Sequence, residues 1–106
     1  FSDEYLNKNP QIYEKISNIL EKNDIQNFLK VYELFVQHKD IEKFHKINSK
    51  TLVITGEGDV GSTPEMSKKL SNVIKNSILK IVPGKHLCSI ECPDDVNNEI
   101  RKLING

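Results

Sequence analysis

Apolar positions in the first 46 residues recur at helical spacing. Asn9 and Pro10 are typical of a helix start, and the apolar stripe that follows them consists of Ile12, Ile16, Ile19 and Leu20. A second helix is predicted to begin at Asn23 or Asp24. Its broad apolar face consists of Ile25, Phe28, Leu29, Tyr32, Phe35 and Val36. Asp40 caps a third, short helical turn in this prediction, so the whole segment is expected to be helical.

The pattern changes after residue 50, where β-branched residues gather in short runs. Residues 51–55 are compact and apolar, as a buried parallel strand requires. Thr63 and Pro64 open a helix, whose predicted apolar face is Met66, Leu70, Val73 and Ile74. Residues 78–82 form a second predicted strand, and Lys80 within it indicates a position at the edge of a sheet.

A turn and a last helix complete this pattern. Pro83-Gly84 is a turn signal. Pro93 and Asp94 open a helix whose predicted inward face is Val96, Ile100, Leu103 and Ile104. Residues 47–106 therefore predict an α/β fold built as a β-α-β-α unit, with two parallel strands and a right-handed crossover.

Composition limits the classes of function. The chain has 106 residues, of which 37% are hydrophobic and 28% charged, as in a small globular domain. Its 15 basic and 15 acidic residues cancel, and its few aromatic residues are not interleaved with basic ones, so nucleic acid is not an expected partner. No apolar run approaches the roughly 20 residues of a membrane helix, and the start of the chain is too polar for a signal peptide. We therefore expect no membrane association and a cytoplasmic location.

Two observations predict that these residues belong to a longer protein. The only methionine is Met66, so Phe1 is not an ordinary translation start. Two parallel strands do not make a stable sheet by themselves, because a parallel sheet needs cover on both faces. If the chain occurs alone, its unpaired strand edges are expected to favour self-association.

An acid and a histidine follow the two predicted strands. Asp59 comes just after the first strand, and His86 comes just after the second. Ligands of open parallel sheets bind beyond the carboxyl ends of the strands, so both side chains are expected on the same side of the sheet. An acid paired with an imidazole provides two of the three groups of a hydrolytic triad. Such chemistry requires no cofactor, and none is predicted.

The two segments that end in these residues resemble those of a known family. Leu-Val-Ile-Thr-Gly-Glu-Gly-Asp at 52–59 resembles the strand-seven segment of α/β-hydrolase fold enzymes. Ile-Val-Pro-Gly-Lys-His at 81–86, followed by Ile-Glu-Cys-Pro at 90–93, resembles their strand-eight segment. The likeness covers residues 47–104, and both motifs occur in the family's order with one helix between them.

This resemblance implies the C-terminal portion of an α/β-hydrolase, with a helical lid, or cap, at residues 1–46 and part of the core at residues 47–106. The family's Gly-x-Ser-x-Gly elbow and oxyanion-hole loop are absent from the chain. The resemblance therefore implies a nucleophile that lies upstream, a parent protein that hydrolyses a small-molecule ester or lactone, and a 106-residue chain that is inactive alone. The alternative is a non-catalytic, stand-alone binding module.

The resemblance also implies a role for each candidate residue. His86 would be the general base that activates the nucleophile, and Asp59 would fix the tautomer of its ring. Glu57 is a nearby competitor for the acid position, and Glu91 is expected to support the site or to begin a helix. Three nearby hydroxyl residues lack an elbow signature and are not expected to act as nucleophiles: Ser62, Thr63 and Ser89.

The remaining histidines, cysteines and aromatic residues have plainer interpretations. His86, Cys88 and Cys92 form His-x-Cys-x3-Cys, which would suit zinc, but a second ligand pair at finger spacing is lacking. We therefore predict no metal site and two half-buried thiols. His38 and His45 are expected to face solvent on the lid. Four aromatic residues are expected to pack within the lid or to line an apolar acyl pocket: Tyr13, Phe28, Tyr32 and Phe35.

Overall fold

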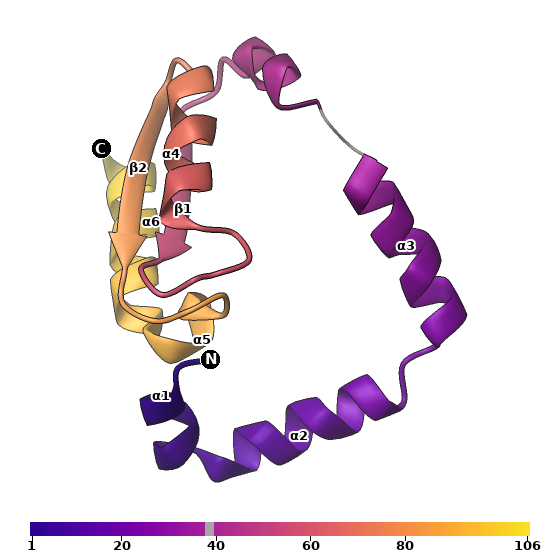
Figure 1. Ribbon diagram of the computed structural model, residues 1–106. Coiled ribbons are helices and arrows are strands. Elements are labelled where there is room, and N and C mark those ends of the chain that lie inside the picture. The colour runs from indigo at the N-terminus through magenta and orange to yellow at the C-terminus, as the bar shows by residue number, and fades with distance from the viewer. Residues whose placement is uncertain (38–39) are drawn as a thin grey trace. The chain divides into compact units, whose positions relative to one another are not determined.

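The computed structural model of the chain describes residues 1–37 and 40–106, which form two compact units (Figure 1). The core unit comprises Phe1–Ser2 and Ile41–Gly106, and the helical unit comprises Asp3–Asp40. The chain therefore leaves the core unit after Ser2 and returns to it at Ile41. The helical unit is thus an insertion within the sequence of the core unit.

The helical unit contains three α-helices, labelled in Figure 1: α1 (Asp3–Lys8), α2 (Pro10–Glu21) and α3 (Ile25–Gln37). The two helices predicted from the apolar pattern are confirmed as α2 and α3, whereas α1 was not predicted. The 3-10 helix η1 (Asp40–Lys46) follows, at the position of the predicted short turn. Across residues 1–37 and 40–106, no helix combines the length and the apolar character needed to cross a membrane.

The cap residues of α2 and α3 behave differently. Asn9 stands at the N-cap position of α2, but its side chain makes no cap there. Its Nδ2 instead donates to the carbonyl oxygen of Tyr5, 3.0 Å away, at the end of α1. Asp24 is a true cap of α3, because its Oδ1 accepts the N–H groups of Gln26 and Asn27 at 2.9 and 3.1 Å. This decides the start of the second predicted helix in favour of Asp24.

The apolar face predicted for α3 exists and is exposed. No residue of α1, α2 or α3 is buried. On α3 the rings of Phe28 and Tyr32 stack with centroids 6.0 Å apart, and those of Tyr32 and Phe35 lie 6.4 Å apart. Phe35 nevertheless remains 74% exposed. The three rings of α3 therefore lie next to one another and remain exposed. The role expected for them, packing within the lid or lining an acyl pocket, stays a prediction.

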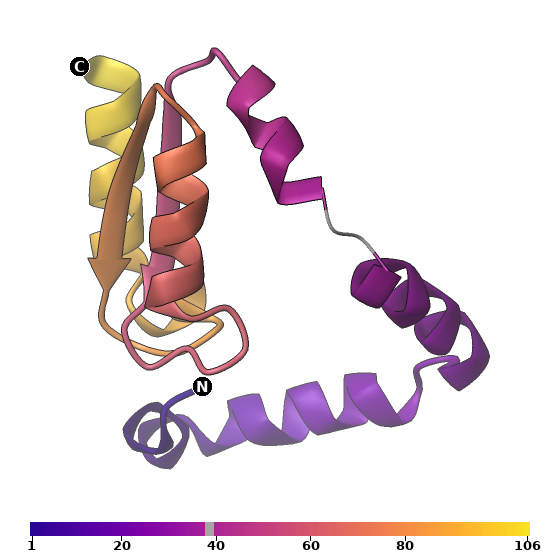
Figure 2. The same ribbon diagram turned by 45° about the horizontal axis from the view of Figure 1, so that its top comes forward.

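The core unit confirms the predicted β-α-β-α order. Strands β1 (Thr51–Gly56) and β2 (Ser77–Val82) are parallel, and α4 (Pro64–Val73) lies between them in the sequence. The short helix α5 (Cys88–Glu91) and the longer α6 (Pro93–Asn105) follow β2 (Figure 2). Of the α-helices in the core unit, α5 was not predicted. In the described sheet each strand has one neighbour.

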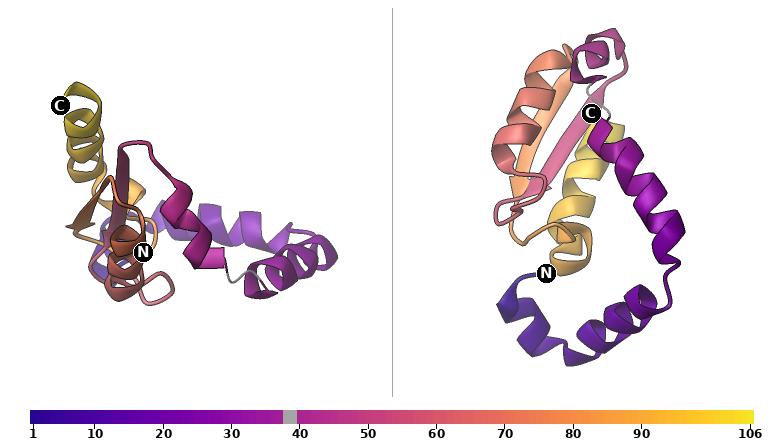
Figure 3. Two further views of the ribbon diagram at one scale, coloured as in Figure 1. Left: turned by 90° about the horizontal axis from the view of Figure 1, so that it is seen from above. Right: turned by 45° about the vertical axis from the view of Figure 1, so that its right-hand side comes forward.

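Helices cover the two faces of this small sheet. Both α4 and α6 contact both strands, and they lie on opposite faces of it (Figure 3). The buried cluster on the α6 side consists of Val82, Cys88 and Val96, against which Ile54 and Cys92 pack. Both cysteines are free thiols; Cys92 is half-buried as predicted, whereas Cys88 is buried. The core therefore lies beneath the loops that follow the strands, next to the candidate site.

Part of the predicted helix burial is wrong. Ile100 and Ile104 on α6 were expected to face inward but are 39% and 75% exposed. Met66, on the predicted apolar face of α4, is 53% exposed. Two strands about 4.8 Å apart present a surface narrower than a helix, whose diameter with side chains is about 10 Å. The outer rows of each apolar helix face therefore extend past the described sheet.

Candidate active site

The acid loop (residues 57–63) joins β1 to α4, and its backbone N–H groups hold the Asp59 side chain. The Oδ1 atom of Asp59 accepts the N–H groups of Gly61 and Ser62, both at 2.9 Å. Thr55 is buried, and its Oγ1 donates to the carbonyl oxygen of Ser62 at 3.0 Å. An aspartate that accepts from residues two and three positions ahead closes a tight turn. The turn leaves Asp59 only 6% exposed, with Oδ2 available to another partner.

The histidine loop (residues 83–87) joins β2 to α5, and backbone hydrogen bonds connect this region to the acid loop. The N–H of Glu57 donates to the carbonyl oxygen of Val82 at 2.8 Å, and the N–H of Gly58 donates to that of Gly84 at 2.9 Å. Gly84 has φ +95°, which side-chain-bearing residues rarely adopt. A Cβ at Gly56 would lie 2.3 Å from the carbonyl oxygen of Lys85. Only glycine permits this close approach of the two loops.

The two loops bring the predicted acid and the predicted histidine into contact. The Nδ1 atom of His86 lies 2.8 Å from Oδ2 of Asp59, and the two residues are 27 positions apart. A carboxylate only accepts, so Nδ1 carries the hydrogen and Nε2 holds the lone pair that can take up a proton. The side chain of Asp59 is 5% exposed, whereas that of His86 is 67% exposed. The buried acid thus orients an accessible imidazole.

The alternative acid, Glu57, does not contact the histidine in this way. Glu57 is exposed on the acid loop, and the ring nitrogen of His86 is bonded to Asp59. Of the two carboxylates near the end of β1, the geometry therefore selects Asp59.

The pKa of the Asp59 carboxyl is lowered from its ordinary value. Burial is the largest single influence and by itself raises the pKa, because it disfavours the charged form. The hydrogen bonds from the Ser62 N–H, the His86 ring and the Gly61 N–H together outweigh burial. Asp59 is therefore a carboxylate at neutral pH, as an orienting acid must be.

Glu91, expected to support the site, is a buried carboxylate at the end of α5. Its side chain is 3% exposed. Its Oε1 accepts the N–H of Lys85 at 3.1 Å, and both of its oxygens accept the N–H of Ser2 at 3.1 Å. The Oγ of Ser2 donates to Oε2 at 2.6 Å. Burial raises the pKa of Glu91, but the Ser2 and Lys85 hydrogen bonds and the charge of the Phe1 ammonium together lower it by more, so the pKa is lowered overall.

The hydroxyl residues near the site have structural roles. Thr63 is the N-cap of α4, because its Oγ1 accepts the N–H of Met66 at 3.3 Å. Ser62 helps to hold Asp59 through its backbone N–H. Ser89 lies within the short helix α5 and is exposed. None of the three stands on a strand-to-helix elbow of the kind a nucleophile requires.

The zinc alternative finds no support in the geometry. The Sγ of Cys92 donates to the carbonyl oxygens of Pro83 and Cys88 at 2.9 and 3.1 Å, and burial raises its pKa, as do the nearby negative groups. Within residues 1–37 and 40–106, no group of three His, Cys, Asp or Glu side chains could hold a metal ion. His45 is exposed on η1, as expected, whereas His38 lies outside the described residues.

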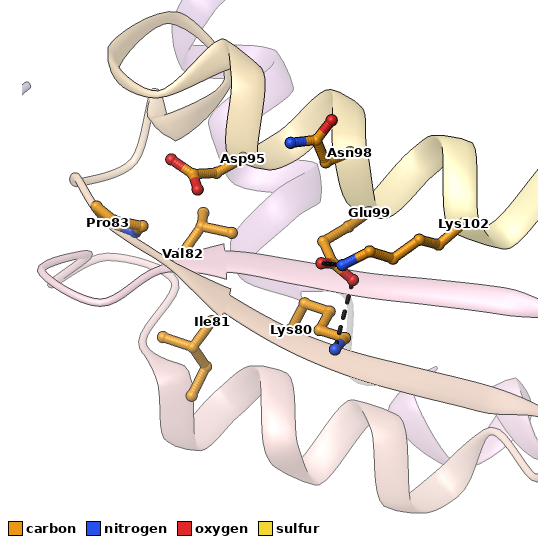
Figure 4. A pocket seen from close by; sticks show the side chains of 8 residues that line it. All are labelled: Lys80, Ile81, Val82, Pro83, Asp95, Asn98, Glu99 and Lys102. Atoms are coloured by element: carbon orange, nitrogen blue, oxygen red, sulfur yellow. Dashed lines mark hydrogen bonds and ion pairs between the residues drawn. The ribbon is translucent and has the colours of Figure 1, made fainter.

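A groove in the core unit lies away from these residues. It has a volume of about 310 Å³ and lies between β2 and α6 (Figure 4). Figure 4 shows Lys80 and Val82 directed toward α6 and Ile81 directed to the opposite face. Lys80 forms an ion pair with Glu99 across the groove at 3.4 Å. Neither Asp59 nor His86 lines this groove, so it is not part of the candidate site.

Sequence reasoning missed the residues that hold Asp59. The contacts of Gly61, Ser62 and Thr55 were not predicted, although Asp-Val-Gly-Ser at 59–62 is typical of a turn closed by an aspartate side chain. The contact between Ser2 and Glu91 joins residues 89 positions apart. No local signal predicts a contact of that kind.

Known structures share this arrangement of helices and strands. The enol-lactonase from Burkholderia xenovorans superposes on the whole chain with a TM-score of 0.94 at 19% sequence identity. A hydrolase from Pseudomonas aeruginosa also superposes on the whole chain, with a TM-score of 0.90 at 17% identity. The chain has the fold of the C-terminal part of an α/β-hydrolase. No family model matches the sequence.

One curated relative and a third solved structure agree with this α/β-hydrolase fold. The 3-oxoadipate enol-lactonase 2 of Acinetobacter baylyi is 22% identical over 104 residues, which are 98% of this chain and 39% of that protein. A serine hydrolase involved in carbazole degradation is 29% identical over 63% of this chain and 26% of its own, with a TM-score of 0.60. The chain spans about two fifths of the length of the two enol-lactonases it matches.

Proposed function

We propose that this chain supplies the acid and the base of a nucleophile-His-Asp triad in an α/β-hydrolase. The observation that carries the proposal is the 2.8 Å contact between the buried Asp59 carboxylate and His86 Nδ1, at the carboxyl ends of adjacent parallel strands. The nucleophile and the oxyanion hole are supplied by residues outside these 106. Residues 47–106 belong to the catalytic core in this proposal, and residues 1–46 form the helical lid over it.

The proposed reaction is acyl transfer in two steps. His86 Nε2 takes the proton of the nucleophile's hydroxyl as its oxygen attacks the carbonyl carbon of the substrate. Asp59 stabilises the imidazolium that forms. The imidazolium then returns the proton to the leaving oxygen as the ester bond breaks. In the second step His86 removes a proton from water as the water oxygen attacks the acyl carbon. The imidazolium then gives this proton to the nucleophile's oxygen as the acyl-enzyme bond breaks, which releases the carboxylic acid and restores the free nucleophile.

The substrate class follows from the named relatives. Two of the proteins that this chain resembles are enol-lactonases, and a lactone is a cyclic ester whose opening needs the same proton transfers. We infer a small ester or lactone as substrate. The insertion of Asp3–Asp40 between two parts of the core unit supports a lid, because such a segment can cover a site without interrupting a strand.

The test measures hydrolysis by the product of the full reading frame that contains these 106 residues. An aryl acetate and a simple enol lactone serve as substrates, and kcat/KM is measured for the unaltered protein, His86→Ala and Asp59→Asn. Each substitution is expected to lower kcat/KM by about 10³- to 10⁴-fold. Glu57→Gln is the matched control, because it removes an exposed carboxylate from the same loop, and it should change kcat/KM less than about threefold.

The isolated chain provides the second arm of this test. The purified 106 residues should show no turnover above that of their own His86→Ala variant. The proposal places the nucleophile and the oxyanion hole outside these residues. Turnover by the isolated chain that His86→Ala abolishes would contradict this part. Full activity of His86→Ala in the longer protein would remove the triad proposal and leave a non-catalytic binding module.

A further inference from the structure

The backbone just before His86 is held by two different elements. On the acid loop, the N–H of Gly58 donates to the Gly84 carbonyl oxygen at 2.9 Å. On α5, Oε1 of Glu91 accepts the N–H of Lys85 at 3.1 Å. The Glu91 side chain also lies over Gly84, where an added Cβ would be 3.2 Å from Glu91 Cβ. The peptide unit between Gly84 and Lys85 is thus fixed at its carbonyl oxygen by one element and at its N–H by the other.

Glu91 also holds Ser2, the residue directly before the helical unit. Ser2 donates its backbone N–H and its hydroxyl to the Glu91 carboxylate, and Asp3 directly after it is the first residue of the helical unit. Figure 2 shows the N-terminus beside the loops that follow the strands. One carboxylate therefore bonds to both the histidine loop and the residue directly before the inserted segment.

The surroundings of the Glu91 side chain require a carboxylate. Every partner of Glu91 that the structure shows is a donor or a cation: two backbone N–H groups, one hydroxyl and the N-terminal ammonium of Phe1, 3.7 Å from Oε1. A carboxylate offers acceptors only, whereas an amide would turn two hydrogens toward one of these donors. With its side chain 3% exposed, an unmatched polar atom there would lack water as a substitute partner.

We propose that Glu91 is a positioning residue for His86, which fixes the histidine loop so that Nδ1 meets Asp59 and which ties that loop to Ser2, the residue before the helical unit. This rests on the proposed function only in treating His86 as the base. Glu91 touches neither the imidazole nor the Asp59 carboxylate in any bond that the structure shows. It acts through the backbone of Lys85.

The first test reads the site in the 106-residue chain without any activity measurement. Histidine ¹⁵N resonances report the tautomer of His86, and amide hydrogen exchange reports the Lys85 N–H. In Glu91→Ala, the Nδ1–H resonance of His86 should be lost or broadened, and the Lys85 amide should exchange at least about tenfold faster. Glu91→Gln keeps one acceptor oxygen for Lys85 and should fall between Glu91→Ala and the unaltered chain.

Two further variants separate positioning from general stability. Glu57→Gln removes an exposed carboxylate nearby and should leave both readings unchanged. Ser2→Ala removes one of the donors to Glu91 and should accelerate Lys85 exchange by a factor smaller than Glu91→Ala does. If Glu91→Ala does not fold, Glu91→Gln and Ser2→Ala carry the test. A lower melting temperature in these variants with unchanged His86 and Lys85 signals would overturn the proposal.

The second test uses the longer, catalytically complete protein. Glu91→Gln should lower kcat by about tenfold to a hundredfold with KM changed less than about twofold, as a misplaced base does. A fall in kcat from Glu57→Gln as large as this, or a kcat unaffected by Glu91→Gln, would count against the proposal. If His86→Ala retains activity, the proposed function fails, while the resonance test in the isolated chain still decides whether Glu91 positions His86.

Discussion

The position of a Cβ on Gly56 lies 2.3 Å from the carbonyl oxygen of Lys85, the residue directly before His86. The same Cβ would lie 2.6 Å from the carbonyl oxygen of Gly84. Both obstacles are backbone atoms, so they cannot rotate out of the way as a side chain would. The last residue of β1 thus sets how closely the histidine loop can approach the acid loop.

Gly56→Ala should therefore destabilise the chain and displace His86. Overpacking of this kind costs about 1–3 kcal/mol, and the free energy of unfolding in urea measures it. Gly61→Ala is the matched control, because an added Cβ there meets nothing closer than the Asp59 Oδ1 at 3.7 Å. It also keeps the N–H that bonds to Asp59. Equal stability of the two variants would show that the loops can separate without cost.

Asp59→Asn should reverse the tautomer of His86 without changing the size of the side chain. The Oδ2 atom of Asp59 accepts from Nδ1 at 2.8 Å, and Oδ1 must still accept from Gly61 and Ser62. The amide nitrogen of asparagine would therefore take the place of Oδ2 and donate to Nδ1, so that the hydrogen of the ring moves to Nε2. Histidine ¹⁵N shifts distinguish the two forms. An Nδ1–H tautomer that persists in Asp59→Asn would contradict the assignment.

Stability should fall in acid, and Glu91 should carry part of that dependence. The pKa values of Asp59 and Glu91 are both lowered in the folded chain. Such groups stabilise the fold above their unfolded values, which are about 3.9 for Asp and 4.3 for Glu, and the contribution is lost as pH falls through the lower folded values. The free energy of unfolding should therefore be steady from pH 7 to about pH 5 and should decrease below about pH 4.

Glu91→Gln provides the comparison, since an amide does not titrate in this range. Its unfolding free energy should be lower at pH 7 and should decrease less steeply below about pH 4 than that of the unaltered chain. Parallel curves for the two proteins would show that Glu91 has the same pKa in the folded and unfolded states.

Asp24→Ala should reduce the helix content of the chain, whereas Asn23→Ala should not. Asp24 caps α3 by accepting the N–H groups of Gln26 and Asn27, and an N-cap of this type contributes about 1 kcal/mol. No residue of α3 is buried, so little tertiary packing compensates for a lost cap. Far-ultraviolet circular dichroism measures the difference. Equal helix content in the two variants would contradict the role of Asp24.

The strands and the pairing of Asp59 with His86 could be predicted because each depends on local pattern and a general rule. The β-branched residues at 51–55 and 78–82 fixed the strands, and the strands' carboxyl ends fixed the side on which the acid and the histidine lie. Burial on the helices was harder to predict. Ile104 has the spacing of an inward residue, but its 75% exposure depends on the width of the sheet, which spacing does not encode.

Other features depend on contacts that no local pattern contains. Asn9 was expected to cap α2, but its side chain bonds to the carbonyl oxygen of Tyr5 instead. Which of these two contacts forms depends on how α1 ends. The α1 helix itself has no apolar stripe that would predict it. Glu91 was expected to have a supporting role, but its partner Ser2 lies at the other end of the chain.

The parallel register of β1 and β2 limits where the chain can gain or lose residues. Thr51 pairs with Ser77 and Gly56 with Val82, so both strands end at the same level. An insertion or a deletion of one residue within β2 would move His86 by about 3.3 Å along the sheet and would turn Val82 to the opposite face. The segment between α4 and β2 is held in the same way, because the carbonyl oxygen of Asn76 accepts the N–H of Thr51 at 2.9 Å.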